Sequence, residues 1–192
     1  MPPFDAYDFP KRAVQGPMVL NRVTVNAVVS NTAVETPIYT FTLPRGTLRK
    51  AERLRLQMLC TVADTTTDIT AAVRTVTLRC TYGATTLGTI TFNTQKGDGA
   101  TNQGMLGAVE YLLSVLLAGA GAPTAQEAQF IAQGNPWVLT NDGLTRLGGS
   151  FVSGGQSAEE NTVPKALSVT VQWSNADASK VVTMKNALLE LL

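Results

Sequence analysis

The clearest pattern in this chain is the alternation of apolar and polar residues near its end. Every second residue from 167 to 173 is apolar, namely Leu167, Val169, Val171 and Trp173. A polar turn at 174–179 separates this run from a second extended run at 181–192. Period-two alternation on both sides of a turn rich in Asn, Asp and Ser predicts a β-hairpin with one buried face.

The same pattern recurs upstream and indicates a mainly β protein. Many short strands separated by turns, such as the one at 44–47, are typical of a sandwich or a barrel. Two of these runs are joined at Gly83, which predicts a short hairpin. The predicted strands cover 19–29, 38–43, 53–62, 75–82, 86–93, 137–140 and 144–153.

Residues 104–133 break the alternation and predict a short helical insertion. Apolar residues recur there at helical spacing and leave only one narrow polar stripe, so the first helix requires burial on most sides. One side could cover the sheet, and another could meet a second subunit. A T-x-x-E capping box at Thr124 predicts a second short helix over 124–133, ended by Gly134. The candidate residues for an oligomer interface are Leu112, Leu113, Leu116 and Leu117.

Residues 1–17 are expected to form an extended arm in front of a single domain at 18–192. Prolines in the arm disfavour regular helix and favour extended backbone. Its aromatic residues are spaced like anchors for pockets on a neighbouring molecule, and an arm folded back on its own domain is the alternative. The candidate residues for binding a partner through the arm are Pro2, Phe4, Tyr7, Phe9, Lys11 and Arg12.

The composition predicts an unusually neutral surface. Charged residues make up 15% of the chain, against about 25% in an average soluble domain. A neutral surface rich in Thr and Ser is typical of strands that pack against another protein. The net charge is +1, so no global field attracts nucleic acid.

Positive charge is nevertheless concentrated near the start of one predicted strand. Residues 1–55 carry eight Lys or Arg and four Asp or Glu, giving +4, and the remainder is −3. The pattern favours the solvated start of a strand. The alternative is a contact patch for an acidic protein surface, formed by Arg45, Arg49 and Lys50. Nucleic-acid binding is not expected, because no aromatic residues interleave with this run.

The residue inventory argues against an enzyme. The chain has no histidine, which excludes histidine catalysis, histidine metal ligation and a cysteine–histidine nucleophile. It contains no P-loop motif. Cys60 and Cys80 lie in alternating strands and are expected to be buried free thiols, which suits a reducing cytoplasm. We expect no catalytic residue, no metal and no cofactor.

The remaining candidates for chemistry have simpler structural explanations. Solvated turns and loops are expected to hold Asp64, Asp68, the Gly-rich segment 96–104 and the pair Glu159–Glu160. Two tryptophans, Trp137 and Trp173, are expected in the core rather than as platforms for sugars. The first residues do not match a secretory signal, and the longest apolar run, 105–118, is too short to span a bilayer. No membrane partner is expected.

Several loose motifs in order along the chain carry a family resemblance. They are Gly46-Thr47-Leu48, the run 76–83, Pro136-Trp137-Val138-Leu139-Thr140, Leu144-Thr145-Arg146-Leu147-Gly148, and 167–171 followed by the closing strand. Over roughly residues 45–192 the chain resembles jelly-roll virion surface proteins of tailed bacteriophages, namely head decoration (cement) proteins and related tail-fibre tips. It departs from that family at 104–133, where the family has a short loop.

The resemblance implies a jelly-roll-like antiparallel β-sandwich and a structural role. It implies a homotrimer, assembled in the host cytoplasm, that binds the outside of the virion and stabilises junctions between major capsid protein subunits. The alternative is a receptor-binding tail-fibre or spike domain that recognises host glycan through loops at 63–72, 96–104 or 154–162. The chain has no shaft repeat, which favours the decoration protein.

Overall fold

A computed structural model of the chain describes residues 17–48, 52–65, 75–94, 108–118, 126–134, 138–140, 143–145, 150–157 and 163–192. These residues form β-strands joined by turns and loops, with no helix among them. The strands are β1 (Met18–Val23), β2 (Ala27–Ser30), β3 (Thr36–Leu43), β4 (Arg53–Asp64), β5 (Thr75–Tyr82), β6 (Thr85–Asn93), β7 (Ala108–Ala118), β8 (Gln126–Gly134), β9 (Val138–Thr140), β10 (Gly143–Thr145), β11 (Ser150–Ser157), β12 (Lys165–Trp173) and β13 (Lys180–Leu191).

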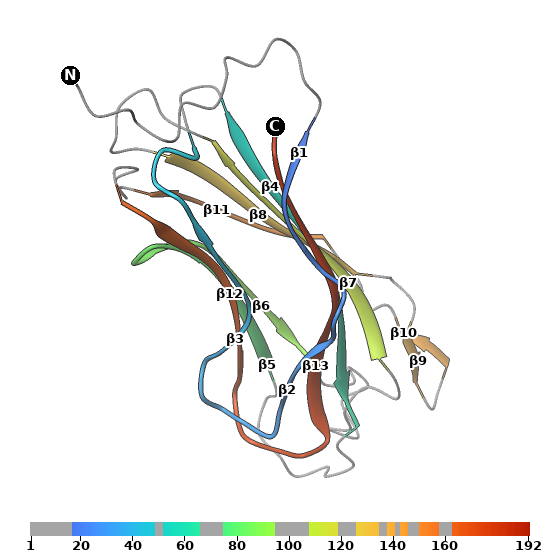
Figure 1. The fold of residues 1–192 in the computed structure, drawn as a ribbon. Helices are drawn as coiled ribbons and strands as arrows, with labels where there is room; N and C mark the ends of the chain where they lie inside the picture. The colour runs from blue at the N-terminus through green and yellow to red at the C-terminus, as the bar shows by residue number, and fades with distance from the viewer. Residues whose placement is uncertain are drawn as a thin grey trace, which may run out of the picture.

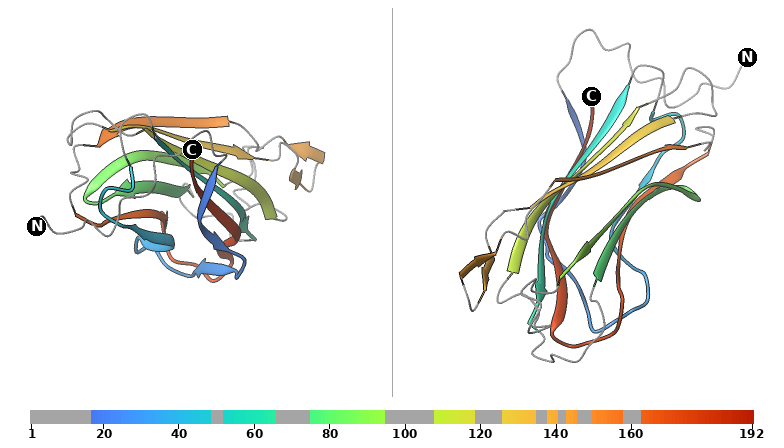
Figure 2. Two further views of the ribbon diagram at one scale, coloured as in Figure 1. Left: turned by 45° about the horizontal axis from the view of Figure 1, so that its top comes forward. Right: turned by 180° about the vertical axis from the view of Figure 1, so that it is seen from behind.

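Two antiparallel sheets make up the body of the protein. The larger sheet, which we call sheet A, has the order β1-β13-β4-β7-β8-β11. Strand β2 pairs with the first part of β13 (181–184), and β1 pairs with its last part (187–191). Sheet B has the order β3-β12-β5-β6, and β9 and β10 form a separate hairpin. Figures 1 and 2 show sheets A and B as two facing layers. The prediction of an antiparallel β-sandwich is therefore confirmed.

The strand order is that of a jelly roll. We count β1 and β2 as one broken strand and set aside β8 to β11. The eight remaining strands then follow the order first, eighth, third, sixth in sheet A and second, seventh, fourth, fifth in sheet B. Two four-stranded sheets with this nested connectivity are the arrangement of a double Greek key. Strands β8 and β11 extend sheet A beyond this frame.

The hydrophobic core lies between the sheets and follows the alternation in the sequence. In β4 and β5 every second side chain is buried, and the residues between them are partly exposed. A one-residue slip would move every one of these side chains to the wrong face, so the pattern fixes the register. Trp173 is among the largest fully buried side chains, as expected. Sheet A contributes Leu56, Met58 and Leu189 to this core, and sheet B contributes Leu78, Val169 and Val171.

The prediction of a closing hairpin is wrong. The two final strands, β12 and β13, lie in different sheets, and the turn at 174–179 carries the chain from one sheet to the other. Strand β12 pairs with β3 and β5, whereas β13 pairs with β1, β2 and β4. Alternation shows that a strand has one buried face, but it does not identify the neighbouring strand. The hairpin of β5 and β6 at Gly83 is confirmed.

The predicted helical insertion at 104–133 is also wrong where the structure describes it. Its two described segments are strands β7 and β8, which pair with each other, and β7 also pairs with β4. A nearly continuous apolar run fits either a buried helix or a strand with neighbours on both sides, and periodicity alone does not separate the two. Sheet pairing overrode the helix propensity of Leu and Ala.

The strand register also divides the four leucines of the predicted oligomer interface. Leu113 and Leu117 pair with Met58 and Leu54, which are core residues of β4. The other two, Leu112 and Leu116, pair with residues of β4 that point away from the core, namely Leu59 and Arg55. A helix would have placed all four on one side. The strand places them at alternate register positions of β7 instead, and the oligomer interface itself stays a prediction.

Candidate interaction surface

The outer side of sheet B carries mostly short hydroxyl side chains, and we call it the hydroxyl face. These side chains alternate with core residues and line up across neighbouring strands. Ser168 pairs with Thr40 on one side and Thr81 on the other, and Thr77 pairs with Thr91. The hydroxyl face consists of Thr40 and Thr42 from β3, Ser168, Thr170 and Gln172 from β12, Thr75, Thr77, Arg79 and Thr81 from β5, and Thr86, Thr89 and Thr91 from β6.

Hydrogen bonds between strands hold these hydroxyl groups in place. The oxygens of Thr77 and Thr91 lie 2.9 Å apart, and those of Thr40 and Ser168 lie 3.0 Å apart. Threonine is β-branched and therefore stiff about χ1. A surface of such side chains loses little rotamer entropy when a partner covers it.

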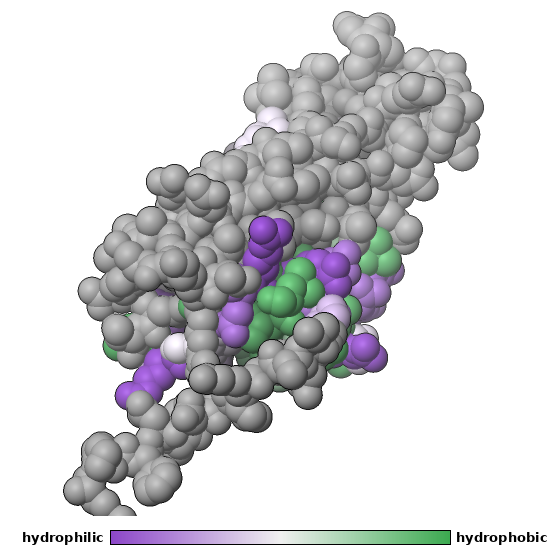
Figure 3. Space-filling view, turned by 90° about the horizontal axis from the view of Figure 1, so that it is seen from above, coloured by the Kyte–Doolittle hydropathy of each residue, from purple (hydrophilic) through white to green (hydrophobic). Residues whose placement is uncertain are grey.

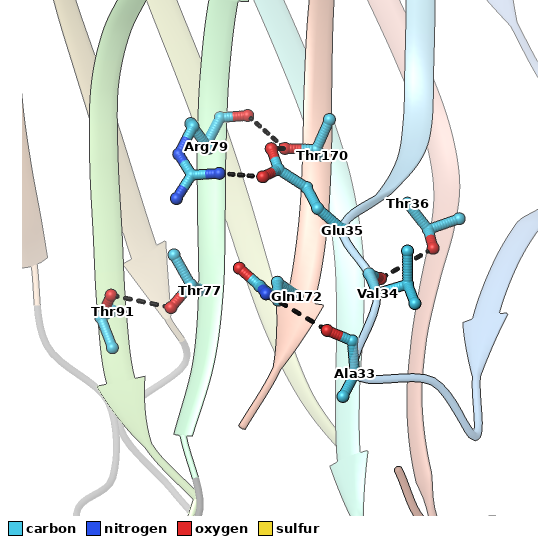
Figure 4. Close-up of polar contacts among 9 residues, drawn as sticks. All are labelled: Ala33, Val34, Glu35, Thr36, Thr77, Arg79, Thr91, Thr170 and Gln172. Atoms are coloured by element: carbon cyan, nitrogen blue, oxygen red, sulfur yellow. Dashed lines mark hydrogen bonds and ion pairs between the residues drawn. The ribbon is translucent and has the colours of Figure 1, made fainter. Parts of the chain in front are cut away.

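One charged side chain reaches over the hydroxyl face from outside the sheet. Glu35 lies just before β3, and its carboxylate contacts the guanidinium of Arg79 from β5. It also accepts a hydrogen bond of 2.5 Å from the hydroxyl of Thr170 on β12 (Figure 4). The hydrogen bond from Thr170 and the contact with Arg79 lower the pKa of Glu35 below its ordinary value. The two opposite charges compensate each other, so this region of the face stays neutral.

A hydrogen bond from a side chain to the backbone fixes the same loop to the sheet. The side-chain amide nitrogen Nε2 of Gln172 donates to the carbonyl oxygen of Ala33 over 3.2 Å (Figure 4). Asn31, at the start of this loop, has φ of 51°, a left-handed conformation that asparagine tolerates better than most residues. The loop thus connects sheet A to sheet B and is tied to the hydroxyl face by Glu35 and Ala33.

The outer side of sheet A has a different character, and we call it the aliphatic face. Aliphatic side chains lie there among polar ones, and two of them are strongly exposed, Val19 by 49% and Val28 by 58%. An ion pair, Arg55 to Glu190, spans β4 and β13 with nitrogen–oxygen distances of 2.7 and 3.0 Å. The aliphatic side chains of this face in the described strands are Val19, Val28, Leu59, Ala63, Val181 and Leu188.

The upper end of the sandwich, where β13 finishes, carries no broad apolar area among the residues that are coloured there. Figure 3 looks onto this end and shows a small hydrophobic area bordered by hydrophilic residues. Of the strongly exposed aliphatic residues, the two that lie within strands, Val19 and Val28, belong to sheet A, whereas Val34 and Val163 lie in segments next to sheet B.

A buried polar cluster joins the two sheets at the opposite end. Asp64 and Lys180 pair in register across β4 and β13, and both are fully buried, as is Thr94 after β6. The hydroxyl of Thr94 donates to the carboxylate of Asp64 over 2.7 Å, and the ammonium of Lys180 contacts the side-chain oxygen of Asn175. The prediction of a solvated loop is wrong for Asp64, because sheet pairing extends β4 by two residues beyond the predicted strand.

Both thiols are buried and free, as predicted from the alternation. Cys60 lies in sheet A and Cys80 in sheet B, and both point into the core. Burial raises the pKa of each thiol to about 12. The thiolate is the reactive form, so neither sulfur is a nucleophile at neutral pH.

Most of the predicted contact residues lie outside the described part of the chain. These are Pro2, Phe4, Tyr7, Phe9, Lys11 and Arg12 of the arm, together with Arg49 and Lys50. Arg45 is described and exposed, in the predicted turn at Gly46 after β3. The segments around Asp68, Asp98, Trp137 and Glu159 are also outside it.

Sequence reasoning missed the contacts of Glu35, because its partners are 44 and 135 residues away. It also missed the division of outward side chains between two unlike faces. The alternation shows which residues of a strand point outward, but it shows which face they share only after each strand has been assigned to a sheet.

Searches for known relatives leave the family open. No protein-family model matches the chain, and no curated protein matches it.

Among the described residues, no group of three or more Cys, Asp or Glu side chains is placed to hold a metal ion. In the same part of the chain, no helix has the length and hydropathy needed to cross a membrane.

Proposed function

We propose that this chain is a structural virion protein that binds the outer surface of a phage capsid as an oligomer and stabilises contacts between major capsid subunits. The observation that carries the proposal is the hydroxyl face. It offers a neutral, hydrogen-bonding surface made mostly of stiff side chains, on a jelly-roll fold of the kind that the family resemblance implies.

The chemistry of this face favours a protein partner over a glycan or a nucleic acid. None of the outward side chains described in sheet B is aromatic, and stacking on aromatic rings is a main source of affinity for bases. Its arginine is compensated by Glu35, so the face offers little attraction to phosphate groups. Neutral hydroxyl groups can exchange water for a partner's hydrogen-bonding groups without burying a charge, which would be costly.

The test is co-sedimentation of the purified protein with undecorated capsids. The variant Thr42→Lys/Thr86→Lys places two ammonium groups at exposed positions of the hydroxyl face. Burying an uncompensated charge costs several kcal/mol, so binding should weaken by more than about 100-fold. The control is Val28→Lys/Leu59→Lys, which adds the same charge to the aliphatic face, assayed at a protein concentration above that needed for capsid saturation.

Wild-type protein that stays in the supernatant with capsids would refute the proposal. Wild-type protein that ignores capsids but pellets with whole bacterial cells would support the alternative, a receptor-binding domain that recognises host glycan. If both lysine variants bind capsids as the wild type does, the hydroxyl face is not the contact surface.

A further inference from the structure

We propose that Lys180 and Asn175 form an intramolecular isopeptide bond, in which the side-chain amine of Lys180 replaces the ammonia of the Asn175 amide. The proposal concerns the chain itself and does not depend on capsid binding. It rests on the buried polar cluster at the end of the sandwich. Lys180 is the first residue of β13 and is fully buried. Lysine is almost never fully buried unless it has a partner, so the groups around its amine decide what it does there.

The two groups that would react are already in contact. The Nζ atom of Lys180 contacts the side-chain oxygen Oδ1 of Asn175, and the carbon that would be attacked, Cγ, is bonded to that oxygen. The hydroxyl of Ser174 donates a hydrogen bond of 3.2 Å to the same oxygen. Attack on a carbonyl carbon places negative charge on its oxygen, and a donor that is already aimed at this oxygen stabilises the charge.

Hydrogen bonds in the turn between β12 and β13 hold the amine and the amide together. The backbone amide of Lys180 donates to the carbonyl oxygen of Asp177 over 3.1 Å. The carboxylate of Asp177 accepts a bond of 2.9 Å from the backbone amide of Ser179. At the start of the turn, the backbone amide of Ser174 donates to the carbonyl oxygen of Thr75 on β5 over 3.0 Å. Folding thus provides the proximity that a reaction between two weakly reactive groups needs.

A buried carboxyl group, that of Asp64, lies beside the amine. Asp64 and Lys180 are register partners on β4 and β13, so their side chains share one side of sheet A, and both are fully buried. The hydroxyl of Thr94 donates to the Asp64 carboxylate over 2.7 Å and fixes its position. An ion pair is costly to bury, and transfer of one proton from the ammonium to the carboxylate leaves two neutral groups in its place. The neutral amine is the nucleophilic form of lysine.

The reaction balances without any external reactant. The Asp64 carboxylate takes a proton from the Lys180 ammonium, and the lone pair of Nζ then attacks Cγ of Asn175. The electron pair of the carbonyl bond moves to Oδ1 and returns as the bond from Cγ to Nδ2 breaks. Asp64 gives its proton to Nδ2, which leaves as ammonia, and takes the excess proton from Nζ. Asn175 is exposed, so ammonia has a path to water.

The new bond would change the energetics of the cluster more than the flexibility of the chain. It replaces the charged amine of Lys180 by a neutral secondary amide, which costs less to bury when it is hydrogen-bonded. It closes only residues 175–180 into a ring, and so short a loop restricts the unfolded chain less than a long one does. The turn that carries the chain from sheet B to sheet A becomes covalently fixed at the start of β13.

The experiment is peptide mapping by mass spectrometry of the purified full chain, denatured and digested with trypsin. Trypsin cleaves after lysines whose side chains are free, and Lys165, Lys180 and Lys185 give the cleavage sites around the turn. We expect residues 166–185 as one peptide, uncut after Lys180 and lighter than its sequence by one molecule of ammonia. A succinimide at Asn175 also loses ammonia, but it leaves the side chain of Lys180 free, so trypsin would cut there.

Three variants separate this bond from other losses of ammonia. Asn175→Ala changes an exposed turn residue, so it should fold, and it should be cut after Lys180 with no loss of ammonia. Asp64→Asn should also be cut there. The matched control Asn186→Ala removes an exposed asparagine of β13 outside the cluster and should still give the linked peptide.

The proposal is overturned if the wild type is cut completely after Lys180, with or without loss of ammonia, or if Asn175→Ala still gives a linked peptide. A linked peptide from Asp64→Asn would overturn the role given to Asp64 as the group that accepts the proton.

Discussion

The alternation of β5 between the core and the hydroxyl face makes a quantitative prediction for two adjacent residues. Leu78 is fully buried and pairs in register with Val171 and Ile90, both core residues. Leu78→Ala removes three carbon groups, worth about 0.8 kcal/mol each on transfer from water. The remaining cavity adds to this, so we expect a loss of about 3 to 4 kcal/mol in the free energy of unfolding. Thr77→Ala removes one hydrogen bond on the exposed side and should cost less than about 1 kcal/mol.

The assay is urea unfolding followed by tryptophan fluorescence, since Trp173 is buried in the native state. The m-value should be the same for both variants, so that the shift in midpoint reports stability alone. For a chain of 192 residues, 3 kcal/mol corresponds to a fall in melting temperature of about 6 to 12 °C. If Leu78→Ala costs less than about 1 kcal/mol, or no more than Thr77→Ala, then the assignment of the two faces of β5 is wrong.

Three further predictions concern the buried polar cluster, the thiols and the loop before β3. Thr94→Val removes a hydrogen-bond donor to the buried Asp64 carboxylate and should lower the free energy of unfolding by about 2 kcal/mol; chemical denaturation would contradict this if the loss were below about 0.5 kcal/mol. A disulfide reagent should label no thiol in the native protein and two in denaturant, because Cys60 and Cys80 are buried; rapid native labelling would disprove their burial. The pKa of Glu35 is lowered on folding, so its stabilisation is present above the unfolded pKa of about 4.3 and is lost as pH falls through the folded value. Glu35→Gln should therefore be less stable than the wild type at neutral pH, by at most about 1 kcal/mol because the pair is partly exposed, and the difference should vanish in acid.

The sequence was sufficient to predict those strands whose two faces differ in polarity. The run 75–82 was predicted with its observed bounds as β5, because apolar and polar residues alternate there without a break. The same property placed Trp173 and both cysteines in the core. Burial on one face leaves a period of two in the sequence, and that period survives in any arrangement of the neighbouring strands.

The errors arose where partners are distant or where both faces are apolar. The alternation of β12 and β13 did not reveal that the turn at 174–179 crosses between sheets, because each strand pairs with residues far away in the chain. The apolar run of β7 lacks period two, so it matched a helix as well as a strand. The sequence predicts a loop at Asp64, because an isolated carboxylate in a sequence does not show that a buried lysine and threonine lie beside it.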